Sequence, residues 1–331
     1  MQTEKLTSWL TRQEPMNVVP VLDKVLVFLH KIMYLVFYLV SRFSLRIVLG
    51  RKRRDRVFFK KGINFRYEYN AIPSLFIIKF LYAVVKFLRL ANNNNPLLLK
   101  ISVSKYDYKA YCPINKDDII NMTIREDEII EHFHTKTGHV IVDIGAHIGR
   151  YSIISSKRVG SRGKVIAIEA HPHNFEILKR NIKLNKLTNV IALNSAVYSK
   201  ETKIKLYTPG QQLGHTIYNT ILSDRAKKED RFVEINSNTL DNLLQQNGIN
   251  HADINWIKID VEGAEFEVLK GATNVLSKSK DIALLIEVHN LHGGTNLYRQ
   301  IVEFLNVYNF KIEFEKTHNG GERHIVVRKQ L

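Results

Sequence analysis

Residues 140–152, VIVDIGAHIGRYS, place an acid and two glycines directly after an apolar run. The run reads as a buried strand, so Asp143 falls at its end and Gly145 and Gly149 lie in the following turn. Glycine lets a backbone approach a ligand closely and turn into a helix. Glu169 follows Gly149 by 20 residues, at the end of the next apolar run, where a carboxylate can accept hydrogen bonds from both hydroxyls of a ribose. The spacing predicts a site for a nucleotide-like ligand.

The glycine pattern itself separates two classes of cofactor. A dinucleotide site normally shows G-x-G-x-x-G, whose amides face a pyrophosphate at a helix N-terminus. Residues 145–149 read G-A-H-I-G instead, with an acid two residues before the first glycine. This pattern is similar to the first motif of class I S-adenosylmethionine methyltransferases. A turn between a strand and a helix with purely structural glycines is the alternative.

A second stretch, IKIDVEGAEFEVLKGA at residues 257–272, carries three acids around a turn. Asp260 ends an apolar run, Glu262 lies in the turn, and Glu265 falls in the first turn of a predicted helix. An acid in that first turn suits the helix dipole, so we interpret Glu265 as a structural cap. Asp260 and Glu262 lie on the edge of the sheet where ligands bind, which favours a functional role.

Transfer of a methyl group to an alcohol requires that the alcohol lose its proton, and a nearby base accelerates this step. The candidate bases follow two predicted strands whose ends meet at one cleft: Asp260, Glu262, Glu287 and His289. His289 is the first choice, with a hydrogen-bonded loop histidine as the alternative. The same groups could hold a divalent cation, since oxygen and imidazole are suitable ligands. No spacing demands a metal, so none is assigned.

Four motifs in order, VDIGAHIG, IEAHP, KIDVEGAE and LLIEVH, resemble the FkbM-type methyltransferases over residues 117–327. The resemblance implies methyl transfer from S-adenosylmethionine to a hydroxyl oxygen. It implies that Glu169 holds the ribose and that Asn194 or Ala196 lies near the adenine. His147 stands where the family often has Asn, and Arg150 where it often has an aromatic or apolar residue. The cofactor-binding residues implied are Asp143, Gly145, Ala146, His147, Gly149, Glu169, Ala170, Asn194, Ala196 and Asp260.

Strand and helix patterns alternate after Gly138, which predicts an α/β architecture. Five apolar runs are typical of strands in a parallel sheet that is covered on both faces: 140–144, 164–170, 190–196, 254–260 and 282–289. Helices are predicted at 125–136 and 174–186, and one or two short strands at 97–113. The end of the chain reads as two strands around an Asn-Gly turn. We therefore expect a Rossmann-like class I methyltransferase fold, with a mostly parallel sheet, a C-terminal antiparallel hairpin and an N-terminal helical extension.

The N-terminal extension, residues 1–95, is basic and apolar and precedes the methyltransferase domain at 96–331. The chain carries a formal charge of +17, and residues 1–100 hold 18 Lys and Arg against 5 Asp and Glu. A run of about 16 apolar residues at 25–40 is shorter than the roughly 20 that span a bilayer. Basic residues fall on one side of a helix drawn through this region: Lys24, Lys31, Arg42, Arg46 and Arg53. A similar segment follows at 72–90.

Such helices can lie in the headgroup layer with their basic groups toward anionic lipid, although a spanning helix and a cover over the domain are alternatives. The single cysteine, Cys112, indicates a reducing compartment. We expect a cytoplasmic protein at the inner face of a membrane. Its expected partners are that anionic surface and a hydroxyl-bearing acceptor such as a glycan, glycolipid or lipid-linked saccharide.

The Asn/Asp-Pro-Pro-aromatic turn of amino methyltransferases is missing, which disfavours nucleic acid. A membrane-tethered binding module without turnover and a methyltransferase of a small-molecule natural product are the alternative functions.

Overall fold

The computed structural model describes residues 98–113, 116–123, 126–207, 232–289, 296–318 and 321–330. The N-terminal extension at 1–95, with its segments at 25–40 and 72–90, lies outside these residues, so its membrane role stays a prediction. In the ranges that are described, none of the helices combines the length and the apolar character that crossing a bilayer requires.

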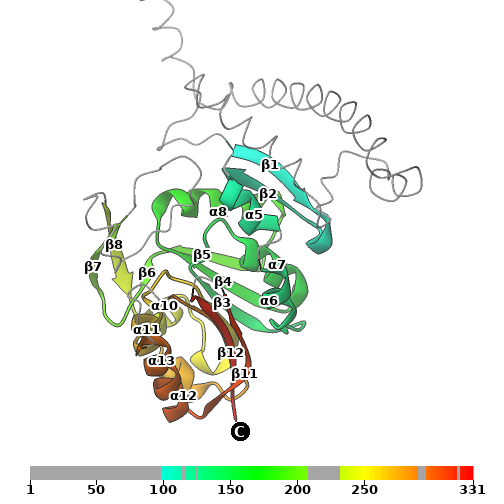
Figure 1. The fold of residues 1–331 in the computed structure, drawn as a ribbon. Helices are drawn as coiled ribbons and strands as arrows, with labels where there is room; N and C mark the ends of the chain where they lie inside the picture. Colours follow the sequence, from blue (N-terminus) through cyan, green and yellow to red (C-terminus); the bar gives the residue numbers. More distant parts are fainter. Residues whose placement is uncertain are drawn as a thin grey trace, which may run out of the picture. The chain divides into compact units, whose positions relative to one another are not determined.

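A seven-stranded sheet forms the centre of the domain, in the order β11-β12-β10-β9-β3-β4-β5 (Figure 1). The strands β3, β4, β5, β9 and β10 pair in parallel, and β12 is antiparallel to both of its neighbours. The predicted fold class, with its C-terminal antiparallel hairpin, is therefore confirmed. The strand bounds are β3 Val140–Ile144, β4 Lys164–Glu169, β5 Val190–Asn194, β9 Ile254–Ile259, β10 Ala283–Val288, β11 Phe310–Thr317 and β12 Arg323–Lys329.

Each parallel strand is apolar on both faces because helices cover both faces of the sheet. Val142 and Ile144 of β3 pack in one hydrophobic cluster, whereas Ile141, the residue before them, packs in another. The first cluster contains residues of α10 Leu240–Gln246, α11 Glu265–Lys270, α12 Thr273–Lys278 and α13 Asn296–Val307. The second contains residues of α6 Asp127–Glu131, α7 Arg150–Val159 and α8 Pro172–Leu184. Because successive side chains of a strand point to opposite faces of the sheet, the position of a residue along the strand decides which helices its side chain packs against.

Two further pieces flank this sheet. The strands β1 Leu98–Val103 and β2 Tyr108–Pro113 pair as an antiparallel hairpin, and α5 Lys116–Thr123 follows it. Strands β6 Ala196–Val197, β7 Thr202–Tyr207 and β8 Phe232–Asn238 form a small third sheet that the sequence pattern did not predict. The apolar run at 190–196 is consequently split between β5 and β6.

The connections place the site. Within the sheet, β4 and β5 lie on one side of β3, and β9 and β10, which come later in the chain, lie on the other side of β3. The carboxyl ends of β3 and β9 therefore flank the point where the strand order reverses. Ligands of open α/β sheets bind at this kind of switch point.

Candidate active site

A cavity opens at the carboxyl ends of the parallel strands, beside the switch point. The residues of its wall that the sequence pointed to are Gly145, Ala146, His147, Glu169, Ala170, Ala196, Asp260, Glu262 and Glu287. The other predicted site residues lie off the wall: Asp143, Gly149, Asn194 and His289. The structure thus brings most of the expected residues to one cavity and gives the remainder different positions.

Asp143 lies behind the wall, where it meets a lysine. Its side chain is 1 % exposed and accepts a hydrogen bond from Ser152 Oγ at 2.5 Å. The register of β3 and β9 sets Asp143 opposite Lys258, and Lys258 Nζ lies 3.8 Å from Asp143 Oδ1. Burial raises the pKa of Asp143, and the Lys258 charge opposes this effect. Asp143 thus pairs with Lys258 in the interior, and its contact with the cofactor stays a prediction.

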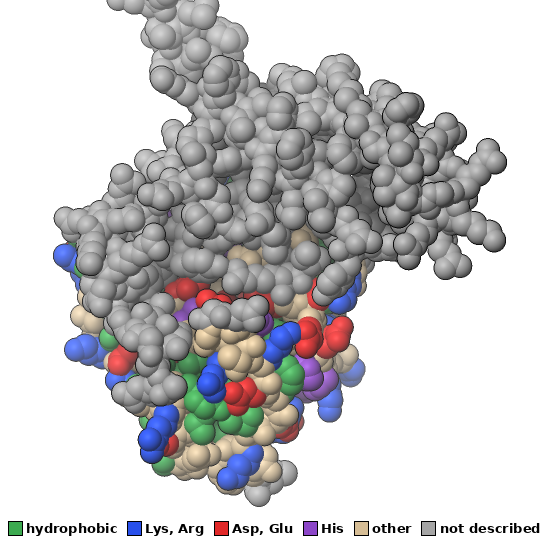
Figure 2. Space-filling view, in the orientation of Figure 1, with side chains coloured by type: hydrophobic (Ala, Val, Ile, Leu, Met, Phe, Trp, Pro, Cys, Tyr) green, Lys and Arg blue, Asp and Glu red, His purple; other side chains and the backbone are tan. Residues whose placement is uncertain are grey.

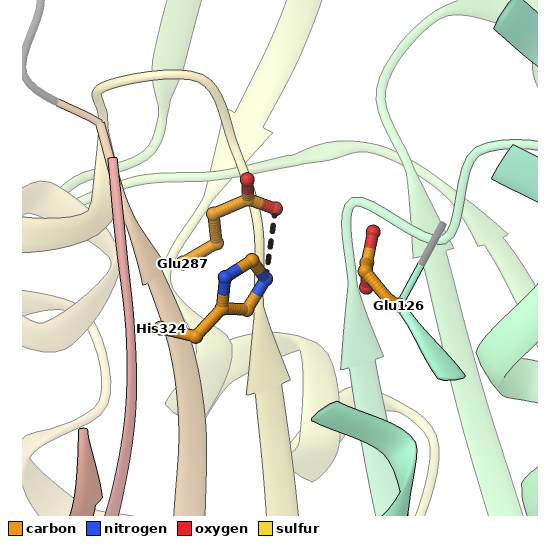
Figure 3. Close-up of side chains that lie close together, drawn as sticks. All are labelled: Glu126, Glu287 and His324. Carbon is orange, nitrogen blue, oxygen red and sulfur yellow. Dashed lines mark ion pairs between the residues drawn. The ribbon is translucent and has the colours of Figure 1, made fainter. Parts of the chain in front are cut away.

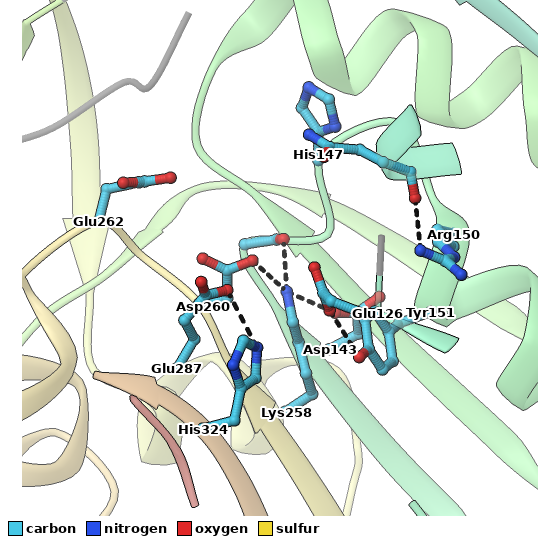
Figure 4. Close-up of polar contacts among 12 residues, drawn as sticks. Glu126, Asp143, His147, Arg150, Tyr151, Lys258, Asp260, Glu262, Glu287 and His324 are labelled. Carbon is cyan, nitrogen blue, oxygen red and sulfur yellow. Dashed lines mark hydrogen bonds and ion pairs between the residues drawn. The ribbon is translucent and has the colours of Figure 1, made fainter. Parts of the chain in front are cut away.

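Lys258 is the buried cation at the centre of the site (Figure 4). Its Nζ donates to Asp260 Oδ2 at 3.0 Å and to Gly145 O at 3.1 Å. Burial alone would lower the pKa of Lys258, but Asp260 and Asp143 more than offset it and raise the pKa. Burial likewise would raise the pKa of Asp260, but Lys258 and His289 lower it to about 2. Lys258 thus stays protonated and ties the end of β9 to the turn after β3.

The two glycines of the turn have different reasons to be glycine. Gly145 has φ +74°, and a Cβ there would lie 1.8 Å from the carbonyl oxygen of Asp260. The turn after β3 therefore passes against the end of β9 with no room for a side chain. Gly149 has φ +103° and precedes α7, and a Cβ there would lie 2.7 Å from Leu178 Cδ1. Gly149 serves the packing of α7 against α8, and its contact with the cofactor stays a prediction.

Glu169 holds the other side of the cavity wall in place. Its Oε2 accepts from the His147 amide at 2.8 Å, and its Oε1 accepts from the His171 amide at 2.9 Å. Burial raises the pKa of Glu169, and His147 opposes this effect. Each carboxylate oxygen can accept a second hydrogen bond. Asn174 adds a side-chain hydrogen bond to Glu169. Glu169 is therefore fixed by the backbone and by Asn174, and keeps acceptor capacity for a ribose hydroxyl.

Asn194 acts on the same loop from behind. Its Nδ2 donates to Glu169 O at 2.8 Å and to Ala170 O at 3.1 Å. Asn194 therefore holds the loop after β4, and its position beside the adenine stays a prediction. Ala196, the alternative, does line the cavity.

His289 lies behind Glu262, away from the cavity wall. It is 4 % exposed, and its Nδ1 lies 2.8 Å from Glu265 Oε1, while its Nε2 lies 3.3 Å from Glu262 Oε2. Glu265 also accepts from the Gly263 amide at 2.9 Å, as a structural cap would. His289 is not on the cavity wall, whereas its partner Glu262 is, so the role of His289 as the base stays a prediction.

Glu262 combines three features of a functional acid. It lines the cavity, and its φ is +55°, a conformation that residues other than glycine rarely adopt. Burial raises the pKa of Glu262 well above its usual range, and His289 opposes this effect. Burial would lower the pKa of His289, but Glu262 and Glu265 raise it well above its usual range. A carboxylate of raised basicity thus faces the cavity with an imidazole behind it.

A further group on the same face of the sheet was missed from the sequence (Figure 3). The register of β10 and β12 sets Glu287 opposite His324, and His324 Nε2 lies 3.4 Å from Glu287 Oε2. Glu126 approaches from the segment before α6 and accepts a hydrogen bond from Tyr151 OH at 2.6 Å. The Glu-x-His alternation around Glu287 and His289 was visible in the sequence, but the partner on β12 depends on register.

Arg150 positions the segment that carries Glu126. It is 6 % exposed, and its guanidinium donates to Asn121 O at 2.7 Å and to Asp127 Oδ1 at 2.8 Å. Arg150 therefore fastens α5 and α6 to the start of α7, beside the cavity. This contact explains how the chain accommodates an arginine where related sequences often have an aromatic or apolar residue.

The cavity suits S-adenosylmethionine by its chemistry. Glu169 offers carboxylate oxygens for the ribose, and Gly145 leaves space where a side chain would collide with backbone. Ala196, Val197 and Leu206 give one part of the wall an apolar surface for an aromatic base. Acids at the ends of β9 and β10 face the remaining part, where the positively charged end of the molecule would lie.

Comparison with known proteins agrees with this chemistry. The model of the methyltransferase FkbM domain matches residues 143–312, about half of the chain. Methyltransferase sdnD of Sordaria araneosa is 30% identical over 207 residues, which are 55% of this chain and 78% of that protein. Hexuronic acid methyltransferase AglP of Haloferax volcanii is 25% identical over 215 residues, which are 65% of this chain and 77% of that protein.

A solved structure of methyltransferase FkbM from Methylobacillus flagellatus aligns with a TM-score of 0.42 and 17% identity. The alignment covers 60% of this chain and 45% of that protein, so the chain spans less than half of its length. The matched family model starts at the first motif and includes the cavity residues of β3, β4, β9 and β10. The chain belongs to the FkbM methyltransferase family, and it is an S-adenosylmethionine-dependent methyltransferase.

Proposed function

We propose that the protein transfers the methyl group to a hydroxyl oxygen of a sugar, in a glycan, a glycolipid or a lipid-linked saccharide near a membrane. The observation that carries this proposal is the acidic wall opposite Glu169. Asp260, Glu262 and Glu287 line it, and Glu126 adds a fourth carboxylate. Carboxylates are strong acceptors for the O–H donors that a sugar presents in number.

The same wall disfavours nucleic acid. Proteins bind nucleic acid mainly by neutralising phosphates with Lys and Arg, and a row of carboxylates would repel them. On the face shown in Figure 2, basic and acidic side chains are interspersed on the described surface and do not form a basic patch. A sugar acceptor also accords with AglP, a relative whose printed name gives hexuronic acid as what it methylates.

The residues divide the work of the reaction as follows. Bound S-adenosylmethionine supplies an electrophilic methyl group. Glu262 accepts the proton of the acceptor hydroxyl, since a carboxylate of raised pKa on the wall is a better base than an ordinary one. His289 positions Glu262 through the contact between Nε2 and Oε2. Lys258 fixes Asp260 and Gly145, so the two strand ends keep a constant distance during transfer.

The direct test is a labelled-methyl assay in which the purified full chain is incubated with S-adenosylmethionine and membrane extracts. We expect label in a saccharide-containing fraction that resists mild alkali, because a methyl ether survives conditions that cleave a methyl ester. The same assay with the Glu201→Gln variant, an exposed acid, should give the wild-type result. Release of the label by mild alkali would move the reaction from a hydroxyl to a carboxylate. Calorimetric binding of S-adenosylmethionine with no label transferred to any fraction would identify a binding module instead.

Membrane association is proposed from the basic, apolar extension at residues 1–95. We expect a variant in which Lys24, Lys31, Arg42, Arg46 and Arg53 are all replaced by Gln to bind anionic vesicles at least tenfold more weakly, since each basic residue at an anionic surface contributes about 1 kcal/mol. The measurement is co-sedimentation with vesicles that contain phosphatidylserine, at low and high salt. A control replaces five exposed lysines of the domain: Lys100, Lys109, Lys164, Lys278 and Lys280. If both variants lose the same amount of vesicle binding, the extension has no special role in membrane association.

A further inference from the structure

We propose that Glu126, Glu287 and His324 form a binding site for a divalent transition-metal cation such as Mn²⁺ or Zn²⁺, beside the methyl-transfer cavity. Each residue offers one ligand atom, and these atoms all lie within 4.8 Å of one another (Figure 3). A cation with bonds of about 2.0 to 2.6 Å holds its ligand atoms up to roughly 5 Å apart. Little side-chain movement would therefore close the site.

The clearest sign of a missing partner is the ring of His324. It is 3 % exposed, and its Nε2 makes no hydrogen bond within the part of the chain that the structure describes. Its nearest carboxylate is Glu287, with Oε2 at 3.4 Å, and Figure 3 shows the ring edge facing the space between Glu287 and Glu126. A buried imidazole nitrogen that has only a long ion pair with Glu287, and whose ligand atom lies within 4.8 Å of those of both acids, is placed as a metal ligand would be.

The surroundings of His324 have the form of an outer coordination shell. His324 Nδ1 lies 2.9 Å from His318 Nε2, so the orientation of the ring is fixed from behind. Ligating histidines are usually held in this way through their second nitrogen. Glu126 is held by Tyr151 OH at 2.6 Å through Oε2, which leaves Oε1 for a ligand. Glu126 and Glu287 both line the cavity. A cation between them would therefore keep free coordination positions on the cavity side.

A neighbouring group, Asp260 with Glu287 and His289, also has spacing that a metal could use. Its members already have strong partners. Asp260 Oδ2 accepts from Lys258 at 3.0 Å, and His289 has Glu265 at 2.8 Å on Nδ1 and Glu262 at 3.3 Å on Nε2. Lys258 and His289 thus already hold the acids of this second group. In the first group, Glu126 is held by Tyr151 OH, a neutral donor, and Glu287 has His324 at 3.4 Å and His289 at 3.8 Å. The neutral partner of Glu126 favours the cation at the first group.

The test is a titration of the metal-free full chain with Mn²⁺, in which free Mn²⁺ is counted by electron paramagnetic resonance and no acceptor is present. We expect one tight Mn²⁺ per chain, displaced by Zn²⁺. The Glu126→Gln and His324→Gln variants should bind it at least tenfold more weakly, because the loss of even an outer-shell partner costs about tenfold or more. The control is His134→Gln, which removes an exposed histidine and should change nothing.

Thermal unfolding and binding of S-adenosylmethionine show whether each variant is folded. If His324→Gln does not fold, Glu126→Gln decides, because Glu126 is only half-buried and glutamine keeps the acceptor for Tyr151. The proposal is overturned if the wild-type chain binds no stoichiometric Mn²⁺, or if both variants bind it as the wild type does. Because the readout is binding, a failure of the sugar-hydroxyl proposal would leave this result unaffected.

Discussion

We expect the Lys258→Met variant to lose about 3 to 5 kcal/mol of unfolding free energy, because breaking a buried ion pair on one side leaves uncompensated charge in the interior. Lys258 is 5 % exposed and balances Asp260 at 3.0 Å and Asp143 at 3.8 Å. Methionine keeps most of the apolar stem, so the loss reports the charge and not a cavity. Chemical denaturation at pH 8 measures the change.

The pH dependence identifies the cause. Burial already raises the pKa of Asp143 in the folded state, and removing the cation takes away the charge that opposes this effect there and that lowers the pKa of Asp260. Acids of raised pKa destabilise the fold at pH above that pKa, and protonation relieves the penalty as the pH falls. The deficit of Lys258→Met should therefore shrink between pH 8 and pH 5. Lys164→Met, an exposed lysine at the start of β4, is the control and should stay within about 0.5 kcal/mol of wild type at either pH. A deficit of equal size at both pH values would point to packing instead.

The fold was largely predictable because its strongest signals are local. Continuous apolar runs marked the five parallel strands, and the Asn-Gly turn marked the final hairpin. The third sheet was not predicted, because β7 and β8 pair across residues 208–231, and the short polar–apolar alternation of β7 does not identify so distant a partner. The predicted helix at 125–136 shortened to α6, Asp127–Glu131, where Arg150 fastens the segment to α7.

The site divides in the same way. Gly145, Glu169, Asp260 and Glu262 could be found because each follows a strand, and strand ends meet at one edge of a parallel sheet. The partners of these residues depend on strand register, which no local pattern gives. Lys258 was visible as the one charge inside the apolar run INWIKI, two residues before Asp260 and so on the same face of the strand.

His289 and His324 are two histidines whose surroundings could not be predicted from local sequence patterns. The sequence predicted His289 near the acceptor, and the structure packs its ring against Glu262 and Glu265, off the cavity wall. No motif in the sequence marks His324 of the hairpin, but the antiparallel pairing of β12 with β10 sets it opposite Glu287. An antiparallel strand beside the parallel strands thus brings a side chain next to Glu287 of the cavity wall from a part of the chain without a motif.

We expect the Glu262→Gln variant to lower the kcat of methyl transfer by about 10² to 10⁴, the usual contribution of a general base. Glutamine has nearly the same shape and keeps an oxygen for contact with His289, but it cannot accept the proton of the acceptor hydroxyl. The affinity for S-adenosylmethionine, measured by calorimetry, should remain within about twofold of wild type. The loss should also be smallest at high pH, where the hydroxyl ionises more readily without a base.

Glu169→Ala is the matched contrast, because it removes an acid from the opposite wall of the same cavity. It should weaken binding of S-adenosylmethionine by about tenfold or more, since a hydrogen bond to a charged group contributes about 1.5 to 3 kcal/mol. At saturating cofactor, its kcat should fall far less than that of Glu262→Gln. If Glu262→Gln instead weakens the cofactor and keeps its kcat, then Glu262 belongs to the cofactor side. The base would then have to be sought at Asp260 or Glu287, the other acids on that part of the wall.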